Sequence, residues 1–557
     1  MGSSSGGKKK FVNFRNRQRA NLSFFIVVMF FGVFGIIVFT EIFFIDERDR
    51  ASGVIVRHGA ISYHGKTPQK IDYEEGFQND DYISVRAGQA MMNDGGFGAF
   101  LVGGRRSGHF PNLENAQPAF SKLISDMQLP SYPDNSTMSE GSWQTVNGTR
   151  YKFFVFSAYY DPRRTQRFIR VIGATKTRGP EGVWCRYRYK AEGNATANFS
   201  KIVPAKIKVI RENWNLMYSA CFIMCPLQNL SVPLSVSIVA RLKDPPSNMI
   251  TVINNYNETW KSVGLDKRNW KFAVCVKPLH FNYNKDIQLL EFIELNLLMG
   301  IEHFILYNHT VGPQVDCLLR DYIARGVVTV LPWNLKIESQ KEIRTEGLFA
   351  ALNDCLYRTM YKFTHALLID FDEYVIPKHN DTLPQLIDYL GHRLNTASTG
   401  SFSFQNAFFY LQWSDDDDVY DFTDPISPNL VTLKKTRRKT KLHPHKQRSK
   451  YICRPELTVE AGNHFIWEFI PGHGTLNVPA DAAILHHYRI CEFGGDDCIK
   501  TQSTLDKTAY RYRERLTGTV RERYDALKTK CVLPQPQAPQ ARVFHKILNM
   551  LKGQKRR

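Results

Sequence analysis

Three acidic residues stand within four positions, directly after a short apolar run. The run 366–369 leads into Asp370, Asp372 and Glu373. Burying this much negative charge at the end of a strand is unfavourable unless a cation compensates it. Because successive side chains of a strand alternate, Asp370 and Asp372 are expected to point to the same side and to share one divalent ion. The pattern predicts a metal site, and an acidic cap of the following turn is the alternative.

Two later positions could complete such a site. His487 offers a neutral imidazole nitrogen as a further ligand, and Arg489 can donate two hydrogen bonds to phosphate oxygens. The alternative is that His486 and His487 are ordinary hydrogen-bonding residues of a strand. His464 follows Gly462 and could face a phosphate group or a second substrate, or be structural, and the sequence leaves both open.

A carboxylate base is needed if the reaction removes a proton from a hydroxyl group. The candidates are Glu468, the acidic run 415–418 and Glu373, and the sequence does not select among them. Glu468 lies between two aromatic residues, which favours a perturbed pKa, so we place it in the catalytic set with Asp370 and Asp372. The run 415–418 is otherwise expected to be a solvated loop.

Positive charge is concentrated between residues 434 and 450, where nine Lys or Arg residues occur without an acidic one. Such a run could close over a diphosphate group or attract an acidic glycan, and a mobile solvated loop is the alternative. Lys450 and Arg454, at and just beyond its end, are candidate phosphate contacts together with Arg489.

The elements that would position these residues follow an alternating pattern. Apolar runs of strand length alternate with segments of helical periodicity, and Gly300 and Gly326 provide stops for the first two helices. Four strands joined by three helical crossovers predict a mostly parallel, doubly wound sheet, in which ligands bind at the carboxyl ends of the strands. The expected strands are 272–276, 303–307, 327–331 and 366–369, and the expected helices are 286–299, 314–325 and 346–362.

The region before these strands and helices has a different pattern of apolar and turn residues. Short apolar or alternating runs separated by turn residues predict a small antiparallel β-domain over residues 149–262. Its aromatic residues could form a sugar-stacking face or simply its core. The runs are 151–159, 168–172, 183–189, 206–210, 216–222 and 232–239.

The N-terminus predicts a membrane anchor. Residues 1–21 contain six basic residues and no acidic one, and they precede nineteen uncharged residues, 22–40. As a helix this run is about 28 Å long, close to the hydrocarbon thickness of a bilayer. Extended to residue 45 it predicts a single transmembrane signal anchor at 22–45, with the tail 1–21 in the cytosol. A cleaved signal peptide is the alternative.

The remaining boundaries follow from composition. Residues 46–148 are rich in Gly, Asp, Asn, Ser and Pro and are expected to form a stem. The α/β region is expected to span 263–533, and 534–557 to form a C-terminal tail.

Composition excludes two broad classes of protein. With 557 residues, 43% of them hydrophobic, the chain is not disordered, because it can bury at least one large core. The net charge of +20 is spread over a globular composition, so nucleic acid is not the expected partner.

The sequons and cysteines favour a lumenal location for the chain that follows the apolar run 22–40. All ten cysteines follow the apolar run, which predicts several disulfides in an oxidising compartment but does not reveal their pairing. Eight Asn-x-Ser/Thr sequons also follow it, at Asn135, Asn147, Asn194, Asn198, Asn229, Asn257, Asn308 and Asn380.

Six segments between residues 151 and 512 resemble those of glycosyltransferase family 92, and the Asp-x-Asp pattern is similar to that of glycosyltransferases of the GT-A type. The resemblance covers roughly two thirds of the chain. The segments are 157–161, 291–296 with Gly300, 353–358, 370–373, 453–456 with Gly462 and His464, and 487–489.

This resemblance implies a Rossmann-like GT-A fold and a metal-dependent, inverting transfer of a hexose, usually galactose from UDP-galactose. In plant members it also implies a carbohydrate-binding β-domain. It favours His487 over His486, so the predicted metal ligands are Asp370, Asp372 and His487, with Mn²⁺ or Mg²⁺ as the ion.

The expected protein is therefore a type II membrane enzyme of the Golgi that acts on a glycan of a glycoprotein or glycolipid, with a homodimer as one option for its assembly. A catalytically inactive lumenal glycan-binding protein is one alternative. A glycan sulfotransferase is another, although no early Gly-rich phosphate loop supports it.

Overall fold

The computed structural model describes residues 129–134, 137–190, 199–227, 231–256, 271–420, 424–491 and 497–536. All of these belong to one compact unit, Ile71–Arg557. The predicted tail 1–21, anchor 22–45 and most of the stem lie outside the described residues, as does most of the tail 534–557. Within the ranges given above, no helix is long and apolar enough to cross a bilayer.

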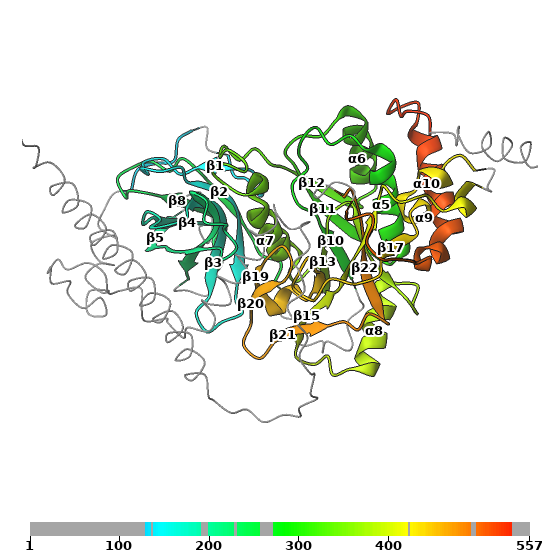
Figure 1. Cartoon of the computed structure of the whole chain (residues 1–557). Helices are drawn as coiled ribbons and strands as arrows, with labels where there is room; N and C mark the ends of the chain where they lie inside the picture. The colour runs from blue at the N-terminus through cyan, green and yellow to red at the C-terminus, as the bar shows by residue number, and fades with distance from the viewer. Residues whose placement is uncertain are drawn as a thin grey trace, which may run out of the picture. The chain divides into compact units, whose positions relative to one another are not determined.

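The first part of the described chain is a mainly antiparallel β-structure (Figure 1). Its strand order is β5-β4-β8-β9-β2-β3-β7-β6, with β1 paired to β2, and the β2–β9 pair is parallel. The Cys185–Cys225 disulfide joins β4 to β7, so the sheet curls round the core between its two halves. The strands are β1 Gln144–Thr145, β2 Phe154–Asp161, β3 Phe168–Lys176, β4 Trp184–Tyr189, β5 Phe199–Pro204, β6 Lys206–Val209, β7 Tyr218–Pro226, β8 Ser235–Val239 and β9 Ile250–Ile253.

This β-structure agrees with the sequence pattern for six strands and adds β1, β5 and β9. Strand β1 pairs with β2, although its residues lie in the segment that composition assigned to the stem. The aromatic side chains of β2 and β4 are largely core residues: Phe156, Tyr159 and Tyr187 are all buried. For these rings the core interpretation holds, and a sugar-stacking role does not.

The second part contains the doubly wound sheet. Strands β12, β11, β10 and β13 lie side by side and parallel, and β18 continues the sheet antiparallel to both of its neighbours. The four parallel strands and three crossover helices match the predicted ranges to within one residue, apart from the third helix. In chain order the elements are β10 Phe272–Cys275, α5 Asp286–Leu298, β11 His303–Asn308, α6 Pro313–Ala324, β12 Val328–Pro332, η4 Thr345–Gly347, α7 Leu348–Thr359, β13 His365–Leu368, β15 Thr399–Phe404, β18 Lys450–Cys453 and β21 Gly474–Asn477.

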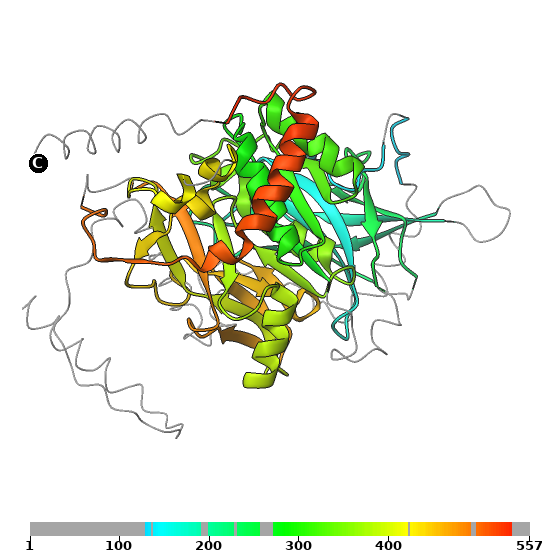
Figure 2. The same cartoon turned by 90° about the vertical axis from the view of Figure 1, so that its right-hand side faces the viewer.

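Successive side chains of the strands point to opposite faces of the sheet, and each face packs against its own hydrophobic core. Phe272 and Val274 of β10 face a core that they share with helices α5, α6 and α10 (Arg513–Leu527). Cys275 of β10 and Leu368 of β13 face a second core, which contains α7 and Phe156 of the β-structure. Figure 2 shows α10 lying across α5. Both faces of the parallel sheet are therefore covered, as its apolar strands require.

Shorter elements complete the described part of the α/β region. Strand β22 pairs with β14 on one side and with β16 on the other. The basic run 434–450 is not one open loop, because it includes β17, which pairs with β23, and the first residue of β18. These elements are β14 Glu373–Pro377, α8 Leu383–Arg393, β16 Asn406–Tyr410, η5 Asp417–Tyr420, η6 Ser427–Asn429, α9 Val431–Lys434, β17 Arg437–Lys439, η7 Pro455–Leu457, β19 Thr458–Ala461, β20 Ile466–Phe469, β22 Ala483–Arg489, β23 Ser503–Leu505 and η8 Thr508–Tyr512.

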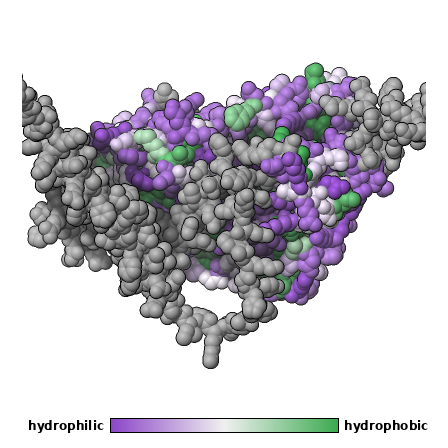
Figure 3. Space-filling view, in the orientation of Figure 1, coloured by the Kyte–Doolittle hydropathy of each residue, from purple (hydrophilic) through white to green (hydrophobic). Residues whose placement is uncertain are grey.

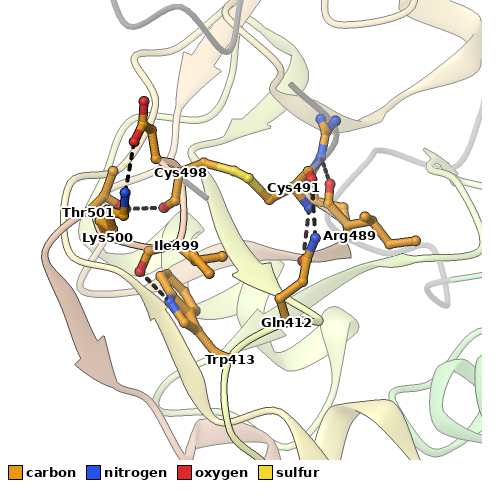
Figure 4. Close-up of a disulfide and its surroundings, with 10 residues drawn as sticks. Gln412, Trp413, Arg489, Cys491, Cys498, Ile499, Lys500 and Thr501 are labelled. Atoms are coloured by element: carbon orange, nitrogen blue, oxygen red, sulfur yellow. Dashed lines mark hydrogen bonds and ion pairs between the residues drawn. A yellow bond between two sulfur atoms is a disulfide. The ribbon is translucent and has the colours of Figure 1, made fainter. Parts of the chain in front are cut away.

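Four disulfides use eight of the ten cysteines, in agreement with the expectation of several. They are Cys185–Cys225, Cys275–Cys355, Cys317–Cys531 and Cys491–Cys498. Cys221 and Cys453 are buried thiols. The last disulfide lies just after β22, where the side chain of Gln412 exchanges two hydrogen bonds with the backbone of Cys491 (Figure 4).

Candidate active site

The acidic motif forms a turn between two strands. Strand β13 ends at Leu368, and β14 begins at Glu373, so Asp370 and Asp372 lie in the connection. The expectation that strand alternation orients the two aspartates was therefore wrong. The turn is closed by two hydrogen bonds: the Glu373 amide donates to the Asp370 carbonyl at 3.1 Å, and the Asp370 amide donates to Glu373 Oε2 at 3.0 Å.

Two lysines converge on Asp370. Lys277 Nζ lies 3.1 Å and Lys450 Nζ 3.3 Å from Asp370 Oδ2. Lys277 comes just after β10 and Lys450 opens β18, and these strands are the two neighbours of β13 in the sheet. Burial alone would raise the pKa of Asp370, but the two ammonium groups hold it well below its ordinary value.

The two lysines differ in their access to solvent. The Lys450 side chain is 4% exposed and also donates to Asn463 Oδ1 at 2.9 Å, whereas the Lys277 side chain is 37% exposed. Burial lowers the pKa of Lys450, but Asp370 and Glu373 outweigh it and raise this pKa overall. Lys450 is thus fixed within the site, and Lys277 stands at its open side.

Asp372 faces His487. In the antiparallel β14–β22 pair, Glu373 is opposite His487. Through this register His487 Nε2 comes within 3.4 Å of Asp372 Oδ2, and His487 Nδ1 within 3.4 Å of Glu373 Oε1. Burial raises the pKa of Asp372, and the imidazole of His487 reverses the shift, so that this pKa is lowered overall.

The donor groups suit a divalent cation in type but are not gathered round one point. Carboxylate oxygens with one imidazole nitrogen are ligands that Mn²⁺ accepts, and Asp372 and His487 already lie side by side. Asp370, however, is engaged by the two lysines. Among the described residues, no three His, Cys, Asp or Glu side chains form a ready metal site. The residues fit such an ion, and the predicted three-ligand set would require Asp370 to turn.

Further positive side chains lie beside His487. The guanidinium groups of Arg489 and Arg448 lie over the ring of Phe408, at 4.9 and 5.5 Å from its centre, and that ring is 5.3 Å from the ring of His487. Burial, with Arg448 as a further cause, lowers the pKa of the nearby His443 to about 3. Through the ring of Phe408, the structure therefore places the predicted Arg489, and Arg448 of the basic run, in the neighbourhood of His487.

Glu468 is placed elsewhere. On β20 it forms ion pairs with Lys208, Arg211 and Arg164, at 2.6, 2.6 and 2.9 Å. Burial raises its pKa, but these three cations lower the pKa overall, whereas a base in an apolar pocket needs the opposite. No contact found within the described residues joins Glu468 to the aspartate turn.

The other predicted residues have structural partners. Arg454 is buried and donates to the Thr396 carbonyl at 3.4 Å. The acidic run is held by lysines: Asp415 pairs with Lys435, while Asp416 and Asp418 pair with Lys507. His464 lies close to the site, because its ring is 3.2 Å from the Asn463 amide nitrogen, and Asn463 contacts Lys450.

Lys277 is the residue that sequence reasoning missed. A single lysine after an apolar run carries no motif. Its position just beyond the strand Phe272–Cys275 was nevertheless a usable signal, because ligands bind at the carboxyl ends of parallel strands.

Together these features define the class of protein. A doubly wound sheet presents an acidic turn, lysines from both adjacent strands and an imidazole at its carboxyl edge, which suits an enzyme that binds a phosphorylated donor. Residues 270–532 match the family model of glycosyltransferase family 92. This match confirms the resemblance to the family that was inferred from the sequence.

Two relatives are galactosyltransferases by name. The β-1,4-galactosyltransferase galt-1 of Caenorhabditis elegans is 22% identical over 381 residues, which cover 67% of this chain and 80% of the relative. The galactan β-1,4-galactosyltransferase GALS1 of Arabidopsis thaliana is 33% identical over 87 residues, which cover 15% of this chain and 17% of that protein.

Similarity to solved structures is weaker. Glucosyl-3-phosphoglycerate synthase from Mycobacterium tuberculosis, in complex with Mg²⁺ and uridine diphosphate, is 12% identical, with a TM-score of 0.20 over 50% of this chain and 85% of that chain. A complex of that synthase with phosphoglyceric acid is 13% identical, with a TM-score of 0.20 over 49% and 85%. Similarity at this level does not assign a ligand to this chain.

Proposed function

We propose that this chain is a galactosyltransferase of the GT-A type, which transfers galactose from UDP-galactose to a glycan hydroxyl group with inversion and with the help of a divalent metal. The observation that carries the proposal is the meeting of Asp370, Asp372, Lys277, Lys450 and His487 at the carboxyl edge of the sheet. The names of the two relatives support galactose as the sugar.

The charges of the site fit a cation and a diphosphate together. Asp370, Asp372 and Glu373 bring three negative charges, against two positive charges from Lys277 and Lys450. Asp372 and His487, with Asp370 once it turns, would hold Mn²⁺ or Mg²⁺, which supplies positive charge to the leaving diphosphate. Lys277 is the exposed ammonium group that can donate to the diphosphate oxygens.

Placement of the enzyme in the Golgi lumen is a further part of the proposal. Four disulfides support an oxidising compartment. The uncharged run 22–40 and its basic flank support a type II anchor. Glu468 is not included as the base, because its carboxylate is paired with three cations.

The experiment is a donor panel. Full-length protein in detergent is incubated with UDP-galactose, other UDP-sugars and a sulfate donor, with and without Mn²⁺, and release of UDP is measured in the presence of a glycan array. Turnover of UDP-galactose that depends on Mn²⁺ is expected. Glycan binding without turnover of any donor would favour an inactive glycan-binding protein, and sulfate transfer would favour a sulfotransferase.

A further inference from the structure

One exposed aromatic residue stands out near the site. The Phe281 side chain is 85% exposed, which is the largest value among the exposed large hydrophobic side chains of the described chain. The described surface is otherwise mostly hydrophilic in the view of Figure 3, with apolar residues in small separate groups. A single exposed apolar side chain is common on protein surfaces, so a role for Phe281 must follow from how its backbone is held and from where it lies.

The backbone that presents Phe281 is strained. Phe281 and Asn282 have φ values of 57° and 51°, in the left-handed region. Asparagine tolerates this region, but phenylalanine adopts it only at an energetic cost. Such strain persists only where neighbouring contacts impose it, and it is concentrated at functional sites.

Those neighbouring contacts are hydrogen bonds on both sides of Phe281. Before it, the Leu279 carbonyl accepts from the amides of His309 and Thr310, both at 3.0 Å. After it, the Asn282 amide donates to Thr310 Oγ1 at 3.1 Å. The ring is therefore held out on a fixed turn, and its exposure does not result from a loose loop.

Both ends of this turn are attached to the acidic motif. Lys277, at its start, pairs with Asp370 at 3.1 Å. Tyr283, at its end, stacks on Phe371 with ring centres 5.2 Å apart and planes 21° apart. Tyr283 is two positions after Phe281, so their Cα atoms lie within about 7 Å of each other. Phe281 is thus fixed at the rim of the proposed donor site.

We propose that the ring of Phe281 is a binding platform for a hexose ring of the acceptor glycan. The inference rests on the proposed function and adds to it the residue that receives the second substrate. An aromatic face offers a large rigid apolar surface to the C–H face of a sugar ring at little entropic cost. Lys450 is recessed beside Asp370, whereas Phe281 faces solvent, from which a glycan must approach.

The test compares Phe281→Asn with Phe281→Trp in the full-length protein. Asparagine suits the left-handed backbone and removes the ring, so folding is preserved, whereas tryptophan keeps an aromatic face. Ile323→Ala, which shortens an exposed apolar side chain on α6, is the matched control. Four quantities are measured: the Kd of UDP, hydrolysis of UDP-galactose without acceptor, and binding and KM on an array of galactose-, fucose- and N-acetylglucosamine-terminated glycans.

For Phe281→Asn we expect about a tenfold loss of acceptor binding and a matching rise in acceptor KM, with an unchanged Kd for UDP and unchanged hydrolysis. Phe281→Trp should restore most of the binding. An equal loss of UDP affinity would show that the ring contacts uracil, and unchanged glycan binding would show that it contacts no substrate. Either result overturns the inference. If the wild-type protein neither binds UDP nor hydrolyses UDP-galactose, the proposed function itself fails.

Discussion

The hydroxyl group of Tyr159 donates a hydrogen bond to Asp354 Oδ1 across 2.6 Å, which joins strand β2 of the β-structure to helix α7 of the glycosyltransferase domain. Tyr307 donates to the other carboxylate oxygen at 2.7 Å, Arg358 pairs with it at 3.0 Å, and Ser157 is a further donor. Asp354 is fully buried. One carboxylate therefore links the two halves of the described chain.

Replacing Asp354 by Ala should lower the free energy of unfolding by about 3–5 kcal/mol, because the largely buried Arg358 would lose its carboxylate partner. Urea unfolding followed by circular dichroism measures the change. Tyr159→Phe is the control and should cost about 1.5–3 kcal/mol, the value of one hydrogen bond to a charged group. An unchanged midpoint for Asp354→Ala would contradict the linking role.

Replacing Asp372 by Asn should reduce turnover of UDP-galactose by about 100-fold or more, because the site loses one carboxylate beside His487. The fold should survive, since the Asp372 side chain is 37% exposed. Calorimetric titration with Mn²⁺ should show weaker binding. Asp418→Asn, at an exposed aspartate paired with Lys507, is the matched control. Full activity and full Mn²⁺ affinity in Asp372→Asn would refute the metal assignment.

Replacing Lys277 by Met should weaken UDP binding about tenfold, equivalent to about 1.4 kcal/mol, because a diphosphate loses one charged donor. Stability should change by less than about 1 kcal/mol, because the Lys277–Asp370 pair is partly exposed. Isothermal titration with UDP measures the affinity. Lys336→Met, at an exposed lysine after β12, should leave it unchanged. If the two variants bind UDP equally well, Lys277 does not contact the donor.

Much of the glycosyltransferase domain could be predicted because its signals are local. The ends of α5 and α6 were found from Gly300 and Gly326, whose φ values of 87° and 73° suit glycine. The start of α7 was placed two residues too early, because Glu346 and Gly347 take left-handed conformations inside an otherwise helical pattern. Strand β5 was missed because it follows the polar segment 191–198.

The site was predicted only in part because its contacts depend on register. His487 reaches Glu373 through the pairing of β14 with β22, which are more than 100 residues apart in the chain. Lys277 reaches Asp370 because β10 and β13 are neighbours. Glu468 was misjudged for the same reason: its apolar neighbours in sequence gave no sign of Lys208 and the other cations brought to it by the β-structure.

Replacing Glu468 by Gln should leave the turnover of UDP-galactose within about twofold of the wild-type rate, because its carboxylate is paired with Lys208, Arg211 and Arg164. Steady-state kinetics measures this, with Asp372→Asn as the inactive reference. If turnover instead fell by about 100-fold or more while UDP affinity and the melting temperature stayed intact, Glu468 would be restored as the base.

The pH dependence of stability should reveal His365. Burial, with Arg454 as a further cause, holds the pKa of His365 well below its ordinary value, and its ring stacks on Phe272 with centres 4.7 Å apart. Between pH 6.5 and this lower folded-state pKa, the unfolded chain binds a proton that the folded chain does not. The contribution of His365 is therefore complete above about pH 6.5, and falls by about 1.4 kcal/mol per unit as the pH decreases below it.

Other titrating groups also contribute to the pH dependence of the unfolding free energy. A variant of His365 is therefore compared with the wild type. Burial lowers the pKa of His486 to about 4, so His486 changes the stability in the same direction as His365. The pKa of Asp161 is lowered by Arg163 and Arg170 against the effect of burial, so Asp161 affects the stability only below about pH 4. Urea unfolding of His365→Phe is measured at about pH 7.5, 6.5 and 5.5. Below about pH 6.5, the unfolding free energy of this variant should change less steeply with pH than that of the wild type, by the amount due to about one proton. Phe272→Leu should lower stability at every pH and keep the wild-type slope. Equal slopes for His365→Phe and the wild type would mean that His365 is protonated in the folded protein.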